Sequence, residues 1–399
     1  MRRNTGIFLI MPPPPVYREQ MCDDLSLVLR GVAEPLEEMV MTLDEVKEIV
    51  KRKEKRTYIG YEPSGPIHMG AASTILKLDE MARAGFTSIA LIADVHAVLN
   101  RKGPENIIRE LGSTYYETVF KELSSGRIKL VLGSEYQLSE DYVMDLLYIS
   151  TKVTSKRAWR AMSIIARESE NPYVSQMIYP LMQALDILYL KVDVAIGGTD
   201  QRKIHALARD IFARPLDLRI ERYVPSAIHI NITPGLLKDE KMSKSKPQTH
   251  IAVHDPPEVI RRKIKAAYCP PGEESQYDQE GNLRNPVLGV FRDLILRGDR
   301  TVQIERARAK GGGIIEVSNY KELERLYTSG EIHPADLKRR AADYLIDLFE
   351  PIREKFESEP DLIKPLYDLQ RWQRREGLFG DLEWKLALES MRPYLGELS

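Results

Sequence analysis

Apolar stretches rich in β-branched residues alternate with amphipathic stretches from residue 56 onward. The runs at 57–61 and 87–99 predict buried strands, and the segment between them, 72–85, has apolar positions at helical spacing. Two apolar strands joined by an amphipathic helix are typical of a parallel sheet, because parallel strands need a long crossover connection. The pattern therefore predicts a βαβ unit at its start.

The same alternation continues along the chain. We predict a helix over 104–123, with Pro104 in its first turn, a strand over 127–134, and a strand over 193–198 that leads into another helix. Strands and helices that alternate in this way indicate an α/β fold with a doubly wound parallel sheet of the Rossmann type.

Three segments depart from this rhythm. Between 139 and 175 helical periodicity replaces the strands, which predicts a helical insertion, and beyond about 270 the pattern is mostly helical. The stretch MPPPPV near the start stays extended and cannot join a sheet, so we predict a partly disordered extension there. The expected organisation is an extension over 1–45, a Rossmann-type domain over 46–268 and a mostly helical domain over 269–399.

Composition narrows the class of protein. With 399 residues, 43% of them hydrophobic, the chain can form a large core, and no apolar run reaches the roughly 18 residues of a membrane helix. We expect a cytoplasmic protein without membrane contact. Two cysteines and no zinc-like Cys/His spacing predict neither a disulfide framework nor a metal site. The net charge of -1 does not by itself indicate a nucleic-acid partner.

The stretch YEPSGPIHMGAAS, residues 61–73, places His68 at the first strand-to-helix turn. In a doubly wound sheet this turn is a favoured phosphate site, because the N–H groups of a helix N-terminus attract anions. Gly60, Gly65 and Gly70 allow a ligand to approach the backbone closely. A single histidine at a helix start can equally be structural, so the assignment depends on a second feature.

The second feature is the stretch KDEKMSKSKPQ, residues 238–248. A run so rich in lysine can be a solvated charged loop. Its spacing also allows Lys241 and Lys244 to reach one polyphosphate, with Ser243 and Ser245 as neutral donors. This is the chemistry that a mobile phosphate clamp requires.

Together, HMG at the first turn and KMSKS late in the same domain resemble the two signature motifs of class I aminoacyl-tRNA synthetases. KMSKS matches without change. The first motif departs from the family, which usually has His-x-Gly-His, because this chain has Ala71 in the fourth position. The departure removes one ring expected to help hold the phosphates of ATP.

The run QMIYPLMQALDILYLKVDVAIGGTDQRKIH, residues 176–205, carries the most information about a substrate. Gln183 and Asp186 share one face of an apolar helix, where polar groups need partners from a structural network or from a ligand. The run resembles the amino-acid-binding segment of tyrosyl-tRNA synthetases of the archaeal and eukaryotic type. The resemblance extends over most of residues 56–356.

The resemblance implies roles for the residues that match. Tyr58 and Asp186 would hold the phenolic hydroxyl of L-tyrosine, and a pair built to bind a hydroxyl rejects phenylalanine strongly. Tyr179, Gln183 and Gln201 would take the α-amino and carboxylate end of the amino acid. Without the resemblance, Tyr58 would be interpreted as a core residue at a strand end.

The same resemblance implies an ATP site. The residues implied are Gly60, His68, Gly70, Asp200, Lys241, Met242, Ser243 and Lys244. Asp200 would bind the ribose, although an acidic residue there can also be a helix N-cap. Catalysis would rest on positive charge from His68, Lys241 and Lys244, with Mg²⁺ on the pyrophosphate, because a carboxylate nucleophile needs no general base.

The resemblance also implies tRNA(Tyr) and a homodimer as partners. His333 and Asp336 match positions that read the anticodon, although HPAD can also be a plain helix start. Near residue 312 the family often has an aromatic residue where this chain has Gly311. In the family the helical insertion forms the dimer interface and lies near the acceptor stem. The basic residues there are Lys152, Lys156, Arg157, Arg160 and Arg167.

The sequence thus predicts a tyrosine–tRNA ligase, which activates L-tyrosine with ATP and transfers the tyrosyl group to the 3′ end of tRNA(Tyr). Two alternatives stay open. Tryptophanyl-tRNA synthetases share the architecture, and a synthetase-like RNA-binding protein with impaired catalysis would agree with Ala71. The segment 369–391 lies beyond the resemblance, and its pattern predicts only amphipathic helix.

Overall fold

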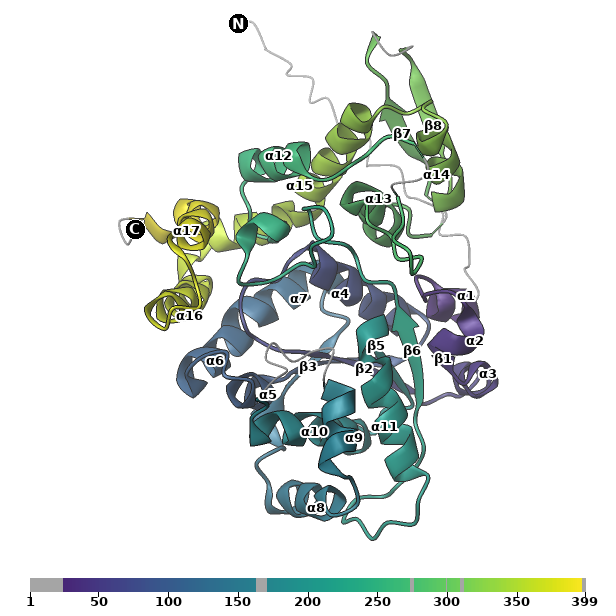
Figure 1. Cartoon of the computed structure of the whole chain (residues 1–399), viewed down its shortest axis with the longest axis vertical. Helices are drawn as coiled ribbons and strands as arrows, with labels where there is room; N and C mark the ends of the chain where they lie inside the picture. Colours follow the sequence, from purple (N-terminus) through teal and green to yellow (C-terminus); the bar gives the residue numbers. More distant parts are fainter. Residues whose placement is uncertain (1–23, 163–170, 273–275, 299, 309–311, 397–399) are drawn as a thin grey trace, which may run out of the picture.

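The central element of the structure is a six-stranded sheet (Figure 1). The computed structural model describes residues 24–162, 171–272, 276–298, 300–308 and 312–396, so the polyproline stretch lies outside the described residues. The strands are β1 (Val40–Met41), β2 (Arg56–Tyr61), β3 (Thr87–Ile92), β4 (Lys129–Leu132), β5 (Val194–Gly198) and β6 (Ser226–Ile230). Their order is β1-β6-β5-β2-β3-β4, and only the β1–β6 pair is antiparallel. The predicted α/β doubly wound sheet is confirmed.

The chain changes direction across the sheet between β2 and β5. After β2 it adds β3 and β4 on one side, and then β5 and β6 on the other. The carboxyl ends of β2 and β5 are therefore neighbours, with Tyr58 in register with Ala195. Doubly wound sheets bind their ligands at this switch point.

Helices cover both faces of the sheet, so alternate strand residues enter two different cores. Ile59 and Tyr61 pack in the core with α4 (Met69–Arg83) and α7 (Glu117–Ser124). Tyr58 packs in the core with α10 (Val174–Tyr189) and α11 (Arg202–Phe212). Burial on both faces explains why these strands have continuous apolar sequences instead of alternating ones.

The strand predicted over 87–99 is wrong in its second half. β3 ends at Ile92, and α5 (Asp94–Leu99) follows at once. The Asp94 carboxylate accepts hydrogen bonds from the backbone N–H groups of Val95 at 3.0 Å and Ser134 at 2.9 Å, which stabilises the helix start. The apolar run continues because α5 is also buried, and periodicity cannot distinguish a short buried helix from a strand.

The helix predicted over 104–123 is interrupted. α6 (Glu105–Leu111) has Pro104 as its N-cap instead of in its first turn, and a π-helical turn, Gly112–Tyr116, joins it to α7. A Cβ at Gly112 would lie 2.7 Å from Cγ2 of Ile92, so the turn depends on glycine to approach β3. The predicted helical insertion contains α8 (Glu140–Ser150) and α9 (Ser155–Met162).

Residues 24–45, predicted to belong to an extension, pack against the sheet together with residues 46–50. They form α1 (Asp24–Leu29), α2 (Leu36–Met39), β1 and α3 (Leu43–Val50). The fully buried ammonium group of Lys77 on α4 donates to the carbonyl oxygens of Leu27, Val28 and Arg30, each at 2.8 Å. This lysine holds the end of α1 against α4. β1 was missed because a two-residue strand has no detectable period.

A mostly helical body lies at one end of the sheet, at the top of Figure 1, as predicted, although its residues 257–266 precede the predicted boundary at 269. Its helices are α12 (Pro257–Ala266), α13 (Pro286–Val290), α14 (Tyr320–Thr328) and α15 (Pro334–Ser358). It also contains an antiparallel hairpin, β7 (Val302–Glu305) with β8 (Ile314–Val317), which the sequence did not predict because both strands are short. One core cluster runs from α4 into α15, so the two parts share apolar packing.

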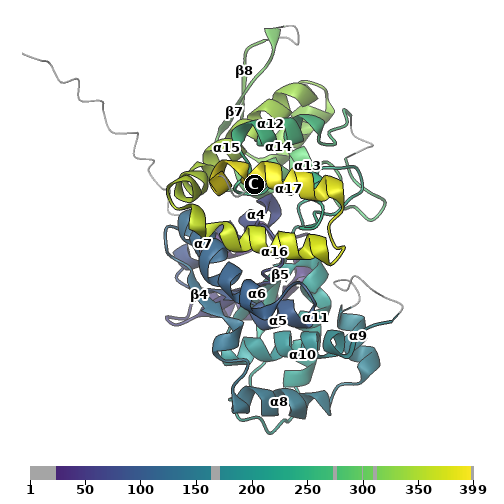
Figure 2. The same cartoon turned by 90° about the vertical axis from the view of Figure 1, so that its left-hand side faces the viewer.

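The last two helices form a hairpin against the side of the molecule (Figure 2). α16 (Lys364–Arg375) packs on α6, and α17 (Asp381–Leu395) packs on α16 and on α15. Within the described residues, no helix is both long and apolar enough to cross a membrane.

Candidate active site

The site predicted for the amino acid contains the carboxylate of Asp186. It is fully buried on α10. Its Oδ1 accepts three hydrogen bonds of 2.8 Å, from the hydroxyls of Tyr136 and Tyr142 and from Nε2 of Gln137. Burial raises the pKa of Asp186, and the three donors and nearby His96 oppose that rise. The three donors fix the carboxylate in one orientation.

The second oxygen of Asp186 is not satisfied. Oδ2 has no hydrogen-bond partner within the described part of the chain, and Nε2 of His96, 3.7 Å away, also has none. An unpaired buried carboxylate oxygen is costly unless a ligand supplies a donor. The geometry therefore leaves one acceptor for an O–H or N–H group that enters the crevice.

Tyr58 on β2 forms part of the same pocket. Its buried hydroxyl donates to the carbonyl oxygen of Gln183 at 3.4 Å and does not bond Asp186 directly. Burial, and then the charge of Asp186, raise the pKa of Tyr58 well above its usual value, so the hydroxyl stays protonated. Tyr58 therefore keeps an O–H group that can turn toward a ligand.

The other residues predicted for the amino acid lie along α10 and at the end of β5. Nε2 of Gln183 donates to Oε1 of Gln201 at 3.1 Å. The hydroxyl of Tyr179 donates to Oε2 of Glu62 at 3.4 Å, and its ring packs edge-on against His96 with centroids 4.6 Å apart. Contacts therefore connect the five predicted residues: Tyr58 with Gln183, Gln183 with Gln201, and Tyr179 with Asp186 through the His96 ring.

His68 is the N-cap of α4. Its Nδ1 accepts a hydrogen bond from the backbone N–H of Ala71 at 3.3 Å. Burial, with the charge of Lys244 as a second cause, lowers the pKa of His68 to about 3. The ring is therefore neutral near pH 7. We expected a cation here, and the structure instead presents an N–H donor with a capping role.

The two lysines of the KMSKS loop face different partners. Nζ of Lys244 donates to the carbonyl oxygen of Glu62 at 2.7 Å and to the hydroxyl of Tyr116 at 2.8 Å. Gly65 has φ +154°, and a Cβ there would lie 2.9 Å from Cβ of Lys244, so only glycine fits the contact. Lys241 is exposed, and its charge acts on Asp200. The lysines do not converge on one point in this arrangement.

The end of β5 is built for side chains that fold back over it. A Cβ at Gly198 would lie 2.7 Å from Oδ1 of Asp200, and one at Gly197 would lie 2.6 Å from Cβ of Gln201. Burial raises the pKa of Asp200, and Lys241 opposes that rise. The glycine pair thus allows Asp200 and Gln201 to line the crevice.

The remaining residues predicted for ATP lie close together. A Cβ at Gly70 would lie 3.0 Å from Cε of Met242 and 3.3 Å from the His68 ring. Exposed Gly60 has open space where its Cβ would be. Hydroxyl oxygens of Ser243 and Ser245 are 3.0 Å apart. The two motifs therefore meet beside the carboxyl end of β2.

The sequence did not single out four residues of this site. Tyr136, Gln137 and Tyr142 bind Asp186 from a segment about 50 positions earlier in the chain. Glu62 accepts from Tyr179 and also from Nδ2 of Asn100 at 2.9 Å. A polar group directly after a parallel strand was the available signal for Glu62, because ligands bind at such strand ends.

The residues predicted for the anticodon lie in the helical body. His333 is the N-cap of α15, and its Nδ1 accepts from the N–H of Ala335 at 3.1 Å. Asp336 is buried, and its carboxylate accepts from Arg339 at 2.9 Å and from the N–H of Ala307 at 3.3 Å. Asp336 lines a hollow with Gln303, Glu305, Ile314, Arg339, Arg340 and Asp343. Gly311 lies outside the described residues.

The basic residues predicted on the insertion differ in exposure and in contacts. Lys152, Lys156 and Arg160 are exposed, whereas Arg157 forms an ion pair with Asp210. Arg167 lies outside the described residues.

Comparison with known proteins identifies similar chains. The family model described as tRNA synthetases class I (W and Y) matches residues 51–350. The chain is 44% identical to the tyrosine–tRNA ligase of Methanopyrus kandleri over 333 residues, which cover 83% of this chain and 96% of that protein. It is also 44% identical to the tyrosine–tRNA ligase of Archaeoglobus fulgidus over 335 residues, 83% of this chain and 98% of that protein.

Solved structures agree with the sequence relatives. The tyrosyl-tRNA synthetase of Archaeoglobus fulgidus, complexed with L-tyrosine, superposes with a TM-score of 0.73 at 42% identity, over 86% of this chain and 98% of that chain. The tryptophanyl-tRNA synthetase of Aeropyrum pernix has a TM-score of 0.61 at 20% identity, over 82% of this chain and 84% of that chain. The second likeness concerns the fold alone.

Proposed function

The chain belongs to the family of class I tRNA synthetases for tryptophan and tyrosine, and we propose that it is a tyrosine–tRNA ligase. It activates L-tyrosine with ATP and transfers the tyrosyl group to the 3′ end of tRNA(Tyr). The relatives that match most of its length are tyrosine–tRNA ligases.

One observation carries the choice of tyrosine. The unpaired Oδ2 of Asp186 lies buried at the crevice, and the protonated hydroxyl of Tyr58 lies in the same pocket. The phenolic hydroxyl of a bound L-tyrosine satisfies both groups, since it donates to the carboxylate of Asp186 and accepts from the O–H of Tyr58. Phenylalanine would leave Oδ2 unpaired, and a site of this kind rejects it strongly.

The first chemical step needs positioning more than proton transfer. A carboxylate oxygen of tyrosine attacks the α-phosphorus of ATP, the bond to the β-phosphate oxygen breaks, and pyrophosphate leaves. Gln183 and Gln201 orient the amino-acid end, and Asp200 holds the ribose. The His68 N–H and the ammonium group of Lys241 stabilise the charge that develops on the phosphates.

Lys244 has a different role in this proposal. Its ammonium group holds the carbonyl oxygen of Glu62, in the turn that leads to His68. Lys244 thus connects the KMSKS loop to the turn that leads to His68. A movement of the loop therefore also moves this turn. Mg²⁺ enters with the phosphates of ATP, which supply the hard oxygen ligands that it prefers.

In the second step a hydroxyl of the terminal tRNA ribose attacks the tyrosyl carbonyl, and AMP leaves. Lys152, Lys156 and Arg160 on the insertion supply exposed positive charge for the RNA backbone. His333 and Asp336 contact the anticodon, where Asp336 accepts from a base edge once Arg339 and the Ala307 N–H release it.

We also propose a homodimer that acts in the cytoplasm. Leu138, Val143, Met144 and Leu147, in and just before α8, are large apolar residues with 38% to 61% of their surface exposed. α8 lies at the end of the molecule opposite the helical body (Figure 1). A second copy of this face would bury these side chains.

Amino-acid-dependent ATP–pyrophosphate exchange tests the function. We expect exchange with tyrosine and at least 100-fold less with tryptophan or phenylalanine. Equal exchange with tryptophan would favour the other member of the family, because an indole N–H can also donate to Oδ2. Folded protein that shows no exchange with any amino acid would mean that Ala71 has abolished catalysis.

A further inference from the structure

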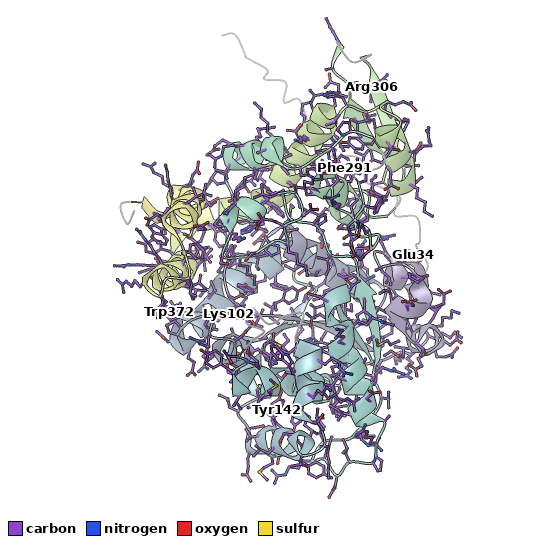
Figure 3. All side chains as sticks on the ribbon, viewed as in Figure 1. Glu34, Lys102, Tyr142, Phe291, Arg306 and Trp372 are labelled. Carbon is purple, nitrogen blue, oxygen red and sulfur yellow. The ribbon has the colours of Figure 1, made fainter. Side chains whose placement is uncertain are left out.

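The C-terminal hairpin α16–α17 lies outside residues 51–350 that the family model matches, and α17 contacts the turn Pro247–Thr249, which follows the KMSKS motif. It is well ordered by its own packing: Leu366 and Leu369 are fully buried, and Tyr394 is almost so. A Cβ at Gly103 would lie 2.4 Å from Cδ1 of Leu369, so α16 fits closely against the segment after α5. Figure 3 labels Trp372 on α16 and Lys102 in that segment.

α16 makes a direct contact with the turn before His68. Buried Nε2 of Gln373 donates to the carbonyl oxygens of Ser64 at 3.2 Å and Lys102 at 3.0 Å. The hydroxyl of Tyr116 binds the same turn from another element, and it donates to the carbonyl oxygens of Glu62 at 3.2 Å and Gly65 at 3.0 Å. Gln373 thus fixes this turn together with Tyr116.

α17 fixes the strand-like segment on the other side of His68. Backbone N–H groups of Met69 and Val253 donate to the carbonyl oxygens of Ile251 at 2.9 Å and Ile67 at 3.0 Å. The Tyr394 hydroxyl donates to the carbonyl oxygen of His254 at 2.7 Å. The two helices of the hairpin therefore reach both sides of His68.

A second contact from α17 supports the same segment. The Ser390 hydroxyl donates to Oδ1 of Asp255. Oδ2 of Asp255 in turn accepts from the N–H of Ala252 at 2.9 Å and from Nζ of Lys263 at 2.7 Å. Because Ala252 bridges to His68, the chain of contacts from α17 ends at the first motif.

We propose that the hairpin α16–α17 braces the ATP-binding turn and that Gln373 is a positioning residue for ATP. The proposal rests on the proposed function, since the turn binds ATP only if the chain is a synthetase. Gln373 bonds Ser64 and Lys102 and none of the five residues predicted for tyrosine, so we expect its loss to affect the nucleotide more than tyrosine. Truncation of the whole hairpin would expose its buried leucines, and point variants are the sharper test.

The experiment compares Gln373→Leu with Gln370→Leu. Gln370 is three residues earlier on α16, is equally buried, and has an Oε1 without a hydrogen-bond partner among the described residues. In tyrosine-dependent exchange, we expect Gln373→Leu to raise KM for ATP or lower kcat roughly 5- to 10-fold, with KM for tyrosine within about twofold of wild type. Gln370→Leu should match wild type in both constants.

Hydrogen–deuterium exchange gives a readout that does not need activity. We expect faster exchange of the backbone amides at residues 62–69 in Gln373→Leu, and a smaller effect in Gln370→Leu. Tyr394→Phe should accelerate exchange at 251–255 in the same way. Unchanged amide exchange in Gln373→Leu, or equal kinetic effects of the two glutamine variants, would overturn the brace. Wild-type protein without pyrophosphate exchange would instead contradict the proposed function and leave the amide test valid.

Discussion

The hydroxyl of Tyr136 donates to Oδ1 of Asp186 at 2.8 Å, so one oxygen of the pocket carboxylate is occupied by the protein itself. Gln137 and Tyr142 complete the set of donors on that oxygen. The other oxygen, Oδ2, has no hydrogen-bond partner among the described residues, so it remains as an acceptor for a ligand. Three donors on one side therefore define where a ligand hydroxyl binds on the other.

Removal of this carboxylate should damage tyrosine binding selectively. In Asp186→Ala three buried donors lose their acceptor as well as the ligand, and we expect KM for tyrosine to rise roughly 100-fold or more. Tyr136→Phe removes one donor and should raise that KM about 5- to 10-fold. Exchange kinetics with varied tyrosine and saturating ATP measure both variants. A normal KM for tyrosine in Asp186→Ala would remove Asp186 from the pocket.

Substitutions in the two phosphate motifs should lower kcat and leave the affinity for tyrosine unchanged. We expect Lys241→Ala to lower kcat for exchange roughly 100-fold, because it removes charge that acts on the phosphates. His68→Asn keeps an acceptor for the N-cap of α4 but loses the ring, and it should lower kcat by a similar factor. Lys246→Ala is the matched control, since Lys246 is exposed on the same loop and pairs with Glu240. An unchanged kcat in Lys241→Ala would show that Lys241 does not act on ATP.

The sequence could predict those parts of the site that lie within single motifs. His68, Asp186 and the KMSKS lysines belong to short segments whose spacing carries the information. The donors on Asp186 come from a different segment, and only the closed fold brings Tyr136 beside it. Likewise, local spacing suggested that Lys241 and Lys244 converge, whereas contact with Glu62 and Tyr116 turns Lys244 away. Gln373 acts on Ser64 across 309 positions, which no periodicity can reveal.

Two buried histidines should make the protein less stable in mild acid. The carbonyl oxygen of Met39 accepts from Nδ1 of His229 at 2.8 Å, and in a neutral His229 ring the other nitrogen, Nε2, accepts from Nδ1 of His205 at 3.0 Å. Burial lowers the pKa of His205 to about 3 and that of His229 to about 4. The unfolded chain binds these protons near pH 6.5, so their stabilisation is present above that pH and is lost as the pH falls toward 4.

Urea unfolding at pH 7 and pH 5 measures this effect. Each histidine should cost about 1.4 kcal/mol of unfolding free energy per pH unit below about pH 6. In His205→Asn the amide can still donate to His229 and does not titrate, so the difference between the two pH values should shrink. An undiminished difference in His205→Asn would exclude this histidine as an acid-sensitive group.

The exposed face of α8 should control oligomeric state. Val143 and Leu147 are four residues apart and Met144 and Leu147 three apart, so all three share one helix face. Leu147→Glu places a charge on that face, and burial of an unpaired carboxylate in a dimer is costly. We expect a dimer for wild type and a monomer for Leu147→Glu by light scattering coupled to size-exclusion chromatography. Leu382→Glu, on α17 with 59% exposure against 55% for Leu147, is the matched control and should stay dimeric. If Leu147→Glu remained dimeric, or wild type were monomeric at micromolar concentration, α8 would not be the interface between copies.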